Sequence, residues 1–194
     1  MLVSDFNRLE GDLVTLVRVD DFELLFQRFQ NPKLYRLTGI KKPPLRSDFE
    51  EDVLVDQTLI VWDVIPEGES ESIGYAFYVA YDGPPYFQYF PFGGVIDLDI
   101  GQDAALLMVH AFFKYTKQPR LHTFIPQPVP DEIDARLIEG GFDRIEEHPT
   151  VDLTIEGAYV IERYTYDAYY GSDEDDDEKE LDFDEPEAMD YDDE

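Results

Sequence analysis

The chain of 194 residues contains 15 basic and 45 acidic residues, which gives a formal net charge of −30 at pH 7. The electrostatic field of so negative a protein repels nucleic acids, polyanions and anionic membranes and attracts basic partners. The alternative interpretation is that the charge serves only solubility or adaptation to a saline habitat. The chain has no cysteine, which excludes disulfides, thiolate metal sites and cysteine nucleophiles.

The two ends of the chain differ in composition. The start has no basic, apolar leader and the sequence has no apolar run of membrane-spanning length, so we expect a cytoplasmic protein. Residues 173–194 hold 15 acidic residues and one lysine. This segment has too few apolar residues to form a folded core. The composition predicts one domain over residues 1–170, followed by an acidic disordered tail over 171–194.

The first elements are a strand, a helix and a second short helix. A β-rich run predicts a strand over Leu13–Val19, and Asp20 and Asp21 can cap a helix whose apolar stripe begins at Phe22. Asn31-Pro32 ends that helix, and after a proline-rich linker Ser47 or Asp48 can cap a short acidic helix over 49–55.

Strands dominate the next part of the chain. The runs "TLIVWDVI" (58–65) and "SIGYAFYVAY" (72–81) predict a hairpin closed by "PEGESE". Prolines and glycines then interrupt at 82–94, and "VIDLDI" (95–100) predicts the next strand, with Asp97 and Asp99 on one face.

Helices and strands alternate in the last part. A buried helix is expected over 104–117, a strand over 120–126, and a helix that begins at Pro130 and ends at Gly140-Gly141. Two more strands are expected near 142–147 and 158–166. Together these elements predict a mixed α/β (α+β) fold, with a mostly antiparallel central sheet flanked by about four helices.

Three segments resemble the GNAT acetyltransferase superfamily, in particular the branch that acetylates protein N-termini and small amines. They are "LVTLVRVDDFELLFQRFQNPKLY", similar to the first strand and helix of that branch, "SIGYAFYV", similar to its third strand, and "DARLIEGGFDRIEE", similar to its fourth helix and sixth strand. The resemblance spans residues 13–166. It implies that acetyl-CoA binds where the fourth and fifth strands separate, with its pyrophosphate on a glycine-rich loop at the start of the third helix.

The residues at that loop depart from the family pattern, which is Gln/Arg-x-x-Gly-x-Gly/Ala. Gln102 matches its first position, but Ala105 and Leu107 stand where glycines are used. Asp103 would cap the helix and compete with a bound phosphate for the backbone N–H groups. The resemblance gives these candidate acetyl-CoA contacts: Ile100, Gly101, Gln102, Asp103, Ala104 and Ala105. We expect acetyl-CoA to bind weakly or not at all, and no metal site.

Candidate catalytic residues are few. The resemblance implies a general base on or near the fourth strand, for which Asp97 and Asp99 are the candidates, unless both simply face solvent. It also implies a tyrosine acid on the fourth helix, where residues 131–140 contain none. The residues His110 and His122 lie in apolar surroundings typical of packed side chains rather than of catalysts.

These features favour an acetyltransferase-like protein with a degenerate acyl-CoA site that acts as a binding or interaction module. Two alternatives are an active N-acetyltransferase for a cationic amine and an acidic decoy for a basic, nucleic-acid-binding protein. The possible contact surfaces are the acidic tail, which otherwise only solvates the chain, and the aromatic run Tyr86–Phe92, which is either an exposed patch or part of the core.

Overall fold

The computed structural model describes residues 7–80, 83–94, 97–126, 130–146 and 155–171. Its strands form one eight-stranded sheet in the order β1-β2-β3-β4-β5-β6-β8-β7, in which the β5–β6 pair is parallel and the other pairs are antiparallel. The strands are β1 (Arg8–Glu10), β2 (Val14–Arg18), β3 (Leu59–Pro66), β4 (Gly74–Val79), β5 (Tyr86–Pro91), β6 (Arg120–Pro126), β7 (Asp143–Ile145) and β8 (Ile155–Glu162).

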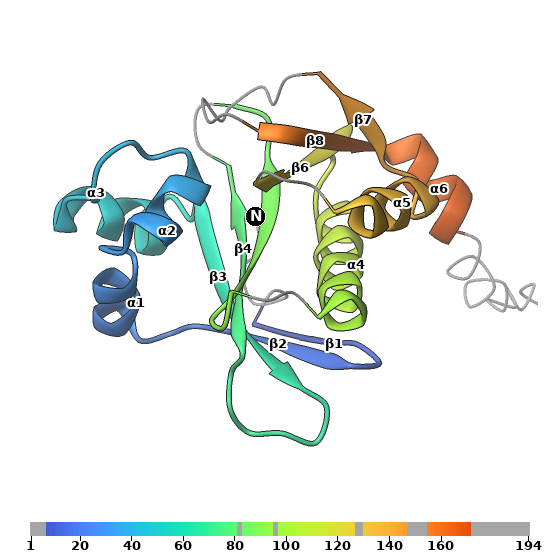
Figure 1. Ribbon diagram of the computed structural model, residues 1–194. Helices are drawn as coiled ribbons and strands as arrows, with labels where there is room; N and C mark the ends of the chain where they lie inside the picture. Colours follow the sequence, from blue (N-terminus) through green and yellow to red (C-terminus); the bar gives the residue numbers. More distant parts are fainter. Residues whose placement is uncertain (1–6, 81–82, 95–96, 127–129, 147–154, 172–194) are drawn as a thin grey trace, which may run out of the picture.

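The helices cover the two faces of this sheet (Figure 1). One group lies on one face and consists of α1 (Phe22–Arg28), α2 (Pro32–Tyr35), the 3₁₀ turn η2 (Arg36–Thr38), α3 (Arg46–Glu50) and the π-helical turn η3 (Glu51–Val55). The other group consists of α4 (Leu98–Tyr115), α5 (Asp131–Glu139) and α6 (Arg163–Tyr170). The mixed fold with a mostly antiparallel sheet is therefore confirmed, with six α-helices among the described residues.

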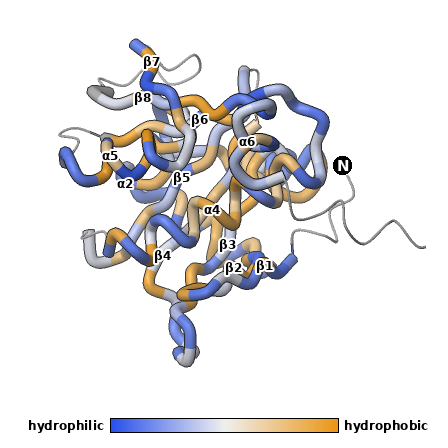
Figure 2. Tube along the Cα trace, turned by 90° about the vertical axis from the view of Figure 1, so that its right-hand side faces the viewer, coloured by the Kyte–Doolittle hydropathy of each residue, from blue (hydrophilic) through white to orange (hydrophobic). Residues whose placement is uncertain are grey.

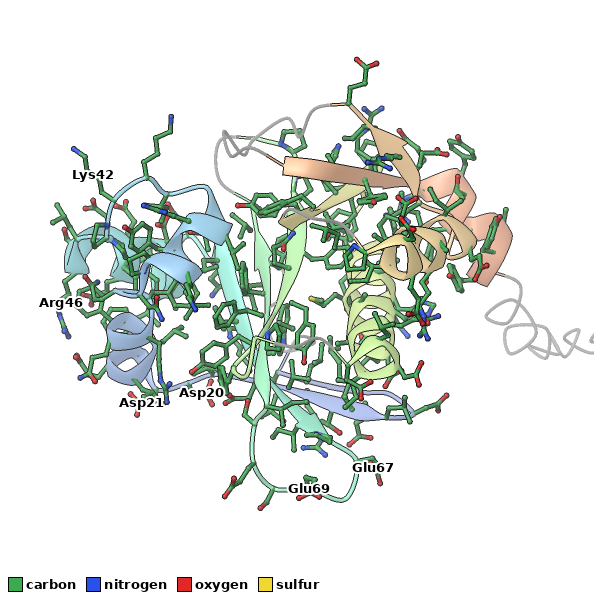
Figure 3. The ribbon with its side chains drawn as sticks, in the orientation of Figure 1. Asp20, Asp21, Lys42, Arg46, Glu67 and Glu69 are labelled. Atoms are coloured by element: carbon green, nitrogen blue, oxygen red, sulfur yellow. The ribbon has the colours of Figure 1, made fainter. Side chains whose placement is uncertain are left out.

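Two hydrophobic clusters hold the helices to the sheet. Along β3 the side chains alternate between them: Ile60, Trp62 and Val64 pack in the cluster beneath α4, and Leu59 and Val61 in the cluster beneath α1–α3. This is the period of two that a strand buried on both faces requires. Figure 2 shows hydrophobic residues along the central strands and α4, and a hydrophilic turn between β3 and β4. Glu67 and Glu69 lie at the tip of that hairpin and point away from the sheet (Figure 3).

The sheet opens between β5 and β6. Their ladder contains two residue pairs, Tyr86 with His122 and Phe87 with Thr123, whereas β6 pairs with β8 along its whole length. Beyond Phe87 and Thr123 the two strands separate. This gap is the structural feature around which the candidate site is built.

The fourth strand of the main run, counted from β2, is β5 and not the expected strand over 95–100. Residues 95–96 lie outside the described residues, and Leu98–Ile100 form the first turn of α4, which begins six residues earlier than expected. The alternation of Leu98 and Ile100 was compatible with a strand, but the cap formed by Asp97 commits the following residues to a helix.

Prolines and glycines around the aromatic run Tyr86–Phe92 predict an interruption, yet most of this run forms β5 inside the sheet. Tyr86 and Phe87 are buried, Tyr89 and Phe90 are half-buried, and Phe92 is exposed. The interpretation as part of the core therefore holds for the strand. Proline at 91 is tolerated because it stands at the end of the strand.

Other expectations shift at their boundaries. Asp21 caps α1, as predicted, but Pro32 begins α2 with Asn31 as its cap rather than only ending a helix. Leu45 and not Ser47 or Asp48 precedes α3. The last predicted strand ends at Glu162, after which α6 begins. The tail over 172–194 lies outside the described residues, and within the described part no helix is long and apolar enough to span a membrane.

Candidate functional site

A cavity of about 130 Å³ lies where β5 and β6 separate, between those strands, α4 and α5. Its lining is mainly apolar and includes Phe87, Leu98, Val109, Ile125, Leu137 and Phe142. Its polar side chains come from four elements: Gln88 and Tyr89 from β5, Gln102 from α4, Thr123 from β6 and Arg136 from α5. The site is therefore an apolar cleft with a few polar groups, which is the usual composition of a small-molecule site.

The side chain of Gln88 bridges the gap between the strands. It is 3% exposed, and its Nε2 donates hydrogen bonds to Thr123 Oγ1 at 3.2 Å and to the carbonyl oxygen of Phe124 at 2.9 Å. Thr123 Oγ1 in turn donates to the carbonyl oxygen of Phe87 at 3.0 Å. Because a carbonyl oxygen only accepts, the atom of Gln88 that faces Phe124 must be the amide nitrogen.

Sequence patterns alone do not select Gln88, because the prolines and glycines of its segment predict an interruption and not a strand. The available signal was a single amide in a run of aromatic residues, "YFQYF". A polar residue inside a buried strand needs hydrogen-bond partners, which only a neighbouring element can supply.

The N-terminus of α4 is capped from within the chain. Asp97 accepts hydrogen bonds through Oδ1 from the N–H groups of Asp99 at 3.1 Å and Ile100 at 3.2 Å. The N–H of Gly101 donates to the carbonyl oxygen of Asp97 at 2.8 Å. A carboxylate thus already occupies the position where the unpaired N–H groups of a helix could bind an anion.

Asp99 is also engaged. Arg136 Nη1, on α5, donates to Asp99 Oδ1 at 2.7 Å and to Gln102 Oε1 at 2.8 Å. The hydrogen bond that Arg136 donates to Asp99 is the largest cause of the raised pKa of the Arg136 guanidinium. These contacts hold α5 against the first turns of α4. Both predicted catalytic aspartates therefore lie at the start of this helix, not on one face of a strand.

Asp103 faces away from the cavity. Its Oδ2 accepts hydrogen bonds from the N–H groups of Leu13 at 2.8 Å and Val14 at 2.9 Å, at the turn between β1 and β2. A Cβ atom at Gly11 would lie 2.5 Å from this oxygen, so a larger residue there would displace the carboxylate from its two hydrogen bonds. The prediction that Asp103 caps α4 is wrong, because Asp97 begins the helix earlier and leaves Asp103 in its second turn.

The six candidate acetyl-CoA residues separate into two groups. Gly101, Gln102 and Ala105 line the cavity. Ile100 and Ala104 pack into the core beneath α4, and Asp103 binds the β1–β2 turn. This distribution follows from the helical period, which places residues three or four apart on one face.

The arrangement of the sheet, its opening and the helices matches solved structures over most of the chain. The structure of apo FdhC, a nucleotide-linked sugar GNAT, matches with a TM-score of 0.55 and 17% identity, covering 83% of this chain and 93% of the other. The chain has the GNAT acetyltransferase fold.

Two further matches show how far this likeness extends. A GCN5-related N-acetyltransferase from Brucella melitensis matches with a TM-score of 0.54 and 14% identity, over 83% of this chain and 80% of the other. AAC(6')-Ib, in complex with ribostamycin and coenzyme A, matches with a TM-score of 0.52 and 18% identity, over 82% and 98% of the two chains. No family model and no curated protein sequence matches the chain. At these identities the likeness establishes the GNAT fold alone.

Within this GNAT fold, the place implied for a general base on or near the fourth strand falls at β5. The polar side chains that β5 contributes to the cavity are Gln88, whose amide is not basic at neutral pH, and Tyr89, whose pKa is raised by burial and by Asp97, so that its hydroxyl stays protonated. The helix α5, which corresponds to the fourth helix, has no tyrosine. Gln88 is thus the residue at the opening that the sequence-based analysis missed.

Neither of the two described histidines lines the cavity. His110 Nδ1 lies 3.0 Å from Tyr166 Oη, which joins α4 to α6. His122 is 4% exposed, and burial is the main cause that lowers its pKa. Among the described residues, no group of three or more histidine and acidic side chains could hold a metal ion.

Proposed function

We propose that this chain is a GNAT-fold binding protein whose acyl-CoA site is degenerate. The single observation that carries this proposal is the capping of α4 by Asp97. It accepts hydrogen bonds from two backbone N–H groups at the helix end where the resemblance implies that the pyrophosphate binds. A bound pyrophosphate would have to displace this carboxylate and would meet its negative charge.

The surroundings of the helix end strengthen this argument. Arg136, the cation beside it, already contacts Asp99 and lies 3.8 Å from Glu132. A phosphate that approaches Arg136 would therefore compete with two carboxylates of the chain. The net charge of −30 adds long-range repulsion of any polyanion, which is strongest at low salt.

The chemistry at the opening of the sheet supports the same function. An acetyl transfer to an amine needs a group that takes a proton from the attacking nitrogen. Gln88 cannot do so, and its amide hydrogens are both used on β6. The alternative of an active N-acetyltransferase, with Asp97 or Asp99 as base, requires one of these carboxylates to leave its present hydrogen bonds.

Titration calorimetry with acetyl-CoA tests this proposal, at low and at moderate salt. We expect no binding at millimolar acetyl-CoA under either condition. Micromolar binding would overturn the degenerate site. An assay of CoA thiol release with a panel of amines is the second measurement, and it has no background from the protein because the chain contains no cysteine.

A further inference from the structure

We infer that the cavity between β5 and β6 binds a small, uncharged, mostly apolar ligand with one group that donates a hydrogen bond to Gln88 Oε1. This inference rests on the proposed function, because it requires a cleft that is not filled by acetyl-CoA. It goes further by naming the class of ligand and the atom that recognises it.

The amide oxygen of Gln88 is a buried acceptor that receives no hydrogen bond from the described residues. Both amide hydrogens are used, on Thr123 Oγ1 and on the carbonyl oxygen of Phe124, which fixes the orientation of the amide. Across the part of the chain that the structure describes, no group donates to Oε1, although the side chain is 3% exposed and lines the cavity. A buried acceptor left without a donor costs free energy, so a donor delivered by a ligand is stabilising.

The cavity has room for such a ligand. Its volume is about 130 Å³, close to the roughly 150 Å³ of an engineered apolar cavity that holds one benzene molecule. Leu98, Val109, Leu137 and Phe142 contribute apolar surface to its wall. A ligand with about six or seven non-hydrogen atoms, most of them carbon, would bury its surface against these side chains.

The charges around the cavity select against ionised ligands. No aspartate or glutamate is among the described residues of its lining, so an ammonium group would be buried without a counter-charge. The cation of the lining, Arg136, is engaged by Asp99 and Gln102, so a carboxylate would have to displace them. An uncharged hydroxyl or amide N–H meets Gln88 Oε1 without either cost.

Phenol and toluene test the inference, because they differ by a hydroxyl in place of a methyl group and phenol is uncharged at pH 7. Affinities for both are measured by calorimetry in the unmutated protein and in the variant Gln88→Met, which replaces the amide by an apolar side chain of similar length. We expect the dissociation constant of phenol to rise about tenfold in the variant, the value of one hydrogen bond, while that of toluene stays or falls.

The matched control is Gln102→Met, which makes the same replacement at another position of the lining. We expect it to leave the ratio of the two affinities unchanged. An equal loss of phenol binding in both variants would overturn the inference, and so would an unmutated protein that binds neither compound up to its solubility limit.

A crystal structure of the unmutated protein with phenol tests the inference even if the variants do not fold. We expect the phenol oxygen within hydrogen-bond distance of Gln88 Oε1. Phenol bound elsewhere, or waters alone in the cavity, would overturn the inference. Because acetyl-CoA is titrated separately, the outcomes are distinguishable: acetyl-CoA binding overturns the proposed function, and the absence of phenol binding overturns this inference alone.

Discussion

Gln88 Nε2 donates a hydrogen bond to the carbonyl oxygen of Phe124 at 2.9 Å, across the gap between β5 and β6. The regular ladder between these strands has ended one residue earlier, at Phe87 and Thr123. The side chain of Gln88 thus continues the hydrogen bonding between β5 and β6 beyond the end of the backbone ladder. At this place β5 and β6 separate to form the cavity, and the hydrogen bonds of Gln88 hold the two strands together.

The first prediction concerns the charge state of this bridge. In Gln88→Glu a carboxylate would face the carbonyl oxygen of Phe124 without a hydrogen to donate. We expect the free energy of unfolding to fall by about 2–4 kcal/mol, because a buried charge is left without a partner. Urea denaturation measures the change.

The control for this prediction is Gln102→Glu, the same chemical change beside Arg136 at the other side of the cavity. Gln102 accepts a hydrogen bond from Arg136, which a carboxylate accepts equally well. We expect a change within about 0.5 kcal/mol, as for most surface substitutions. Equal losses in the two variants would contradict the role given to Gln88.

The second prediction concerns Asp103 and the β1–β2 turn. Asp103→Ala removes the acceptor for two N–H groups, at Leu13 and Val14, and we expect a loss of about 1–3 kcal/mol of stability. Gly11→Ala is expected to destabilise the unmutated chain, because its Cβ would lie 2.5 Å from Asp103 Oδ2. The cost of Gly11→Ala should be smaller in the Asp103→Ala background, as a double-mutant cycle would show. Additive effects would mean that the two residues do not interact.

The third prediction separates two effects of Asp97: its stabilisation of α4 as a helix cap, and the exclusion of a bound pyrophosphate by its carboxylate. Asp97→Gly frees the N–H groups of Asp99 and Ile100 and should cost only a few tenths of a kcal/mol, whereas Asp97→Ala should cost about 1 kcal/mol. We expect calorimetry to detect weak acetyl-CoA binding in Asp97→Gly and none in Asp103→Gly. If both variants stay silent, the carboxylate of Asp97 is not what excludes the pyrophosphate.

The fourth prediction follows from the lowered pKa of His122, for which burial is the largest cause. Because the folded state binds this proton less readily than the unfolded state, stability is fully present above the unfolded pKa near 6.5. It is lost as the pH falls below that value towards the folded pKa. We expect His122→Gln to unfold with a weaker dependence on pH between about 6.5 and 5 than the unmutated protein. Parallel pH profiles of the two proteins would contradict this.

Elements with strong local signals could be predicted from the sequence. The strand Arg120–Pro126 and the helix stop at Gly140-Gly141 agree with the structure, because alternating apolar residues and a glycine with φ of 85° at position 141 act within a few residues. The cap at Asp21 was found for the same reason. The tail and its partners, the cytoplasmic location and the roles of the candidate residues stay predictions.

The candidate site was less predictable. Asp97, Asp99 and Asp103 are all candidate site residues in the sequence. Residues 98–100, however, begin α4 instead of ending a strand, and this changes the expected partner of each carboxylate. Asp97 caps α4, Asp99 binds Arg136 from α5, and Asp103 binds the β1–β2 turn ninety positions earlier. No local pattern distinguishes these three outcomes.

The sequence by itself therefore determined the class of fold, the acidic charge and the absence of thiol chemistry, since composition and local periodicity suffice for them. The tertiary structure decided that β5 is the strand beside the opening, that Gln88 bridges it, and that a cavity remains there. The physical reason is that a hydrogen bond or a cavity between distant segments depends on their register in the sheet. Residues such as Gln88 and Phe124, 36 positions apart, meet only when that register is set.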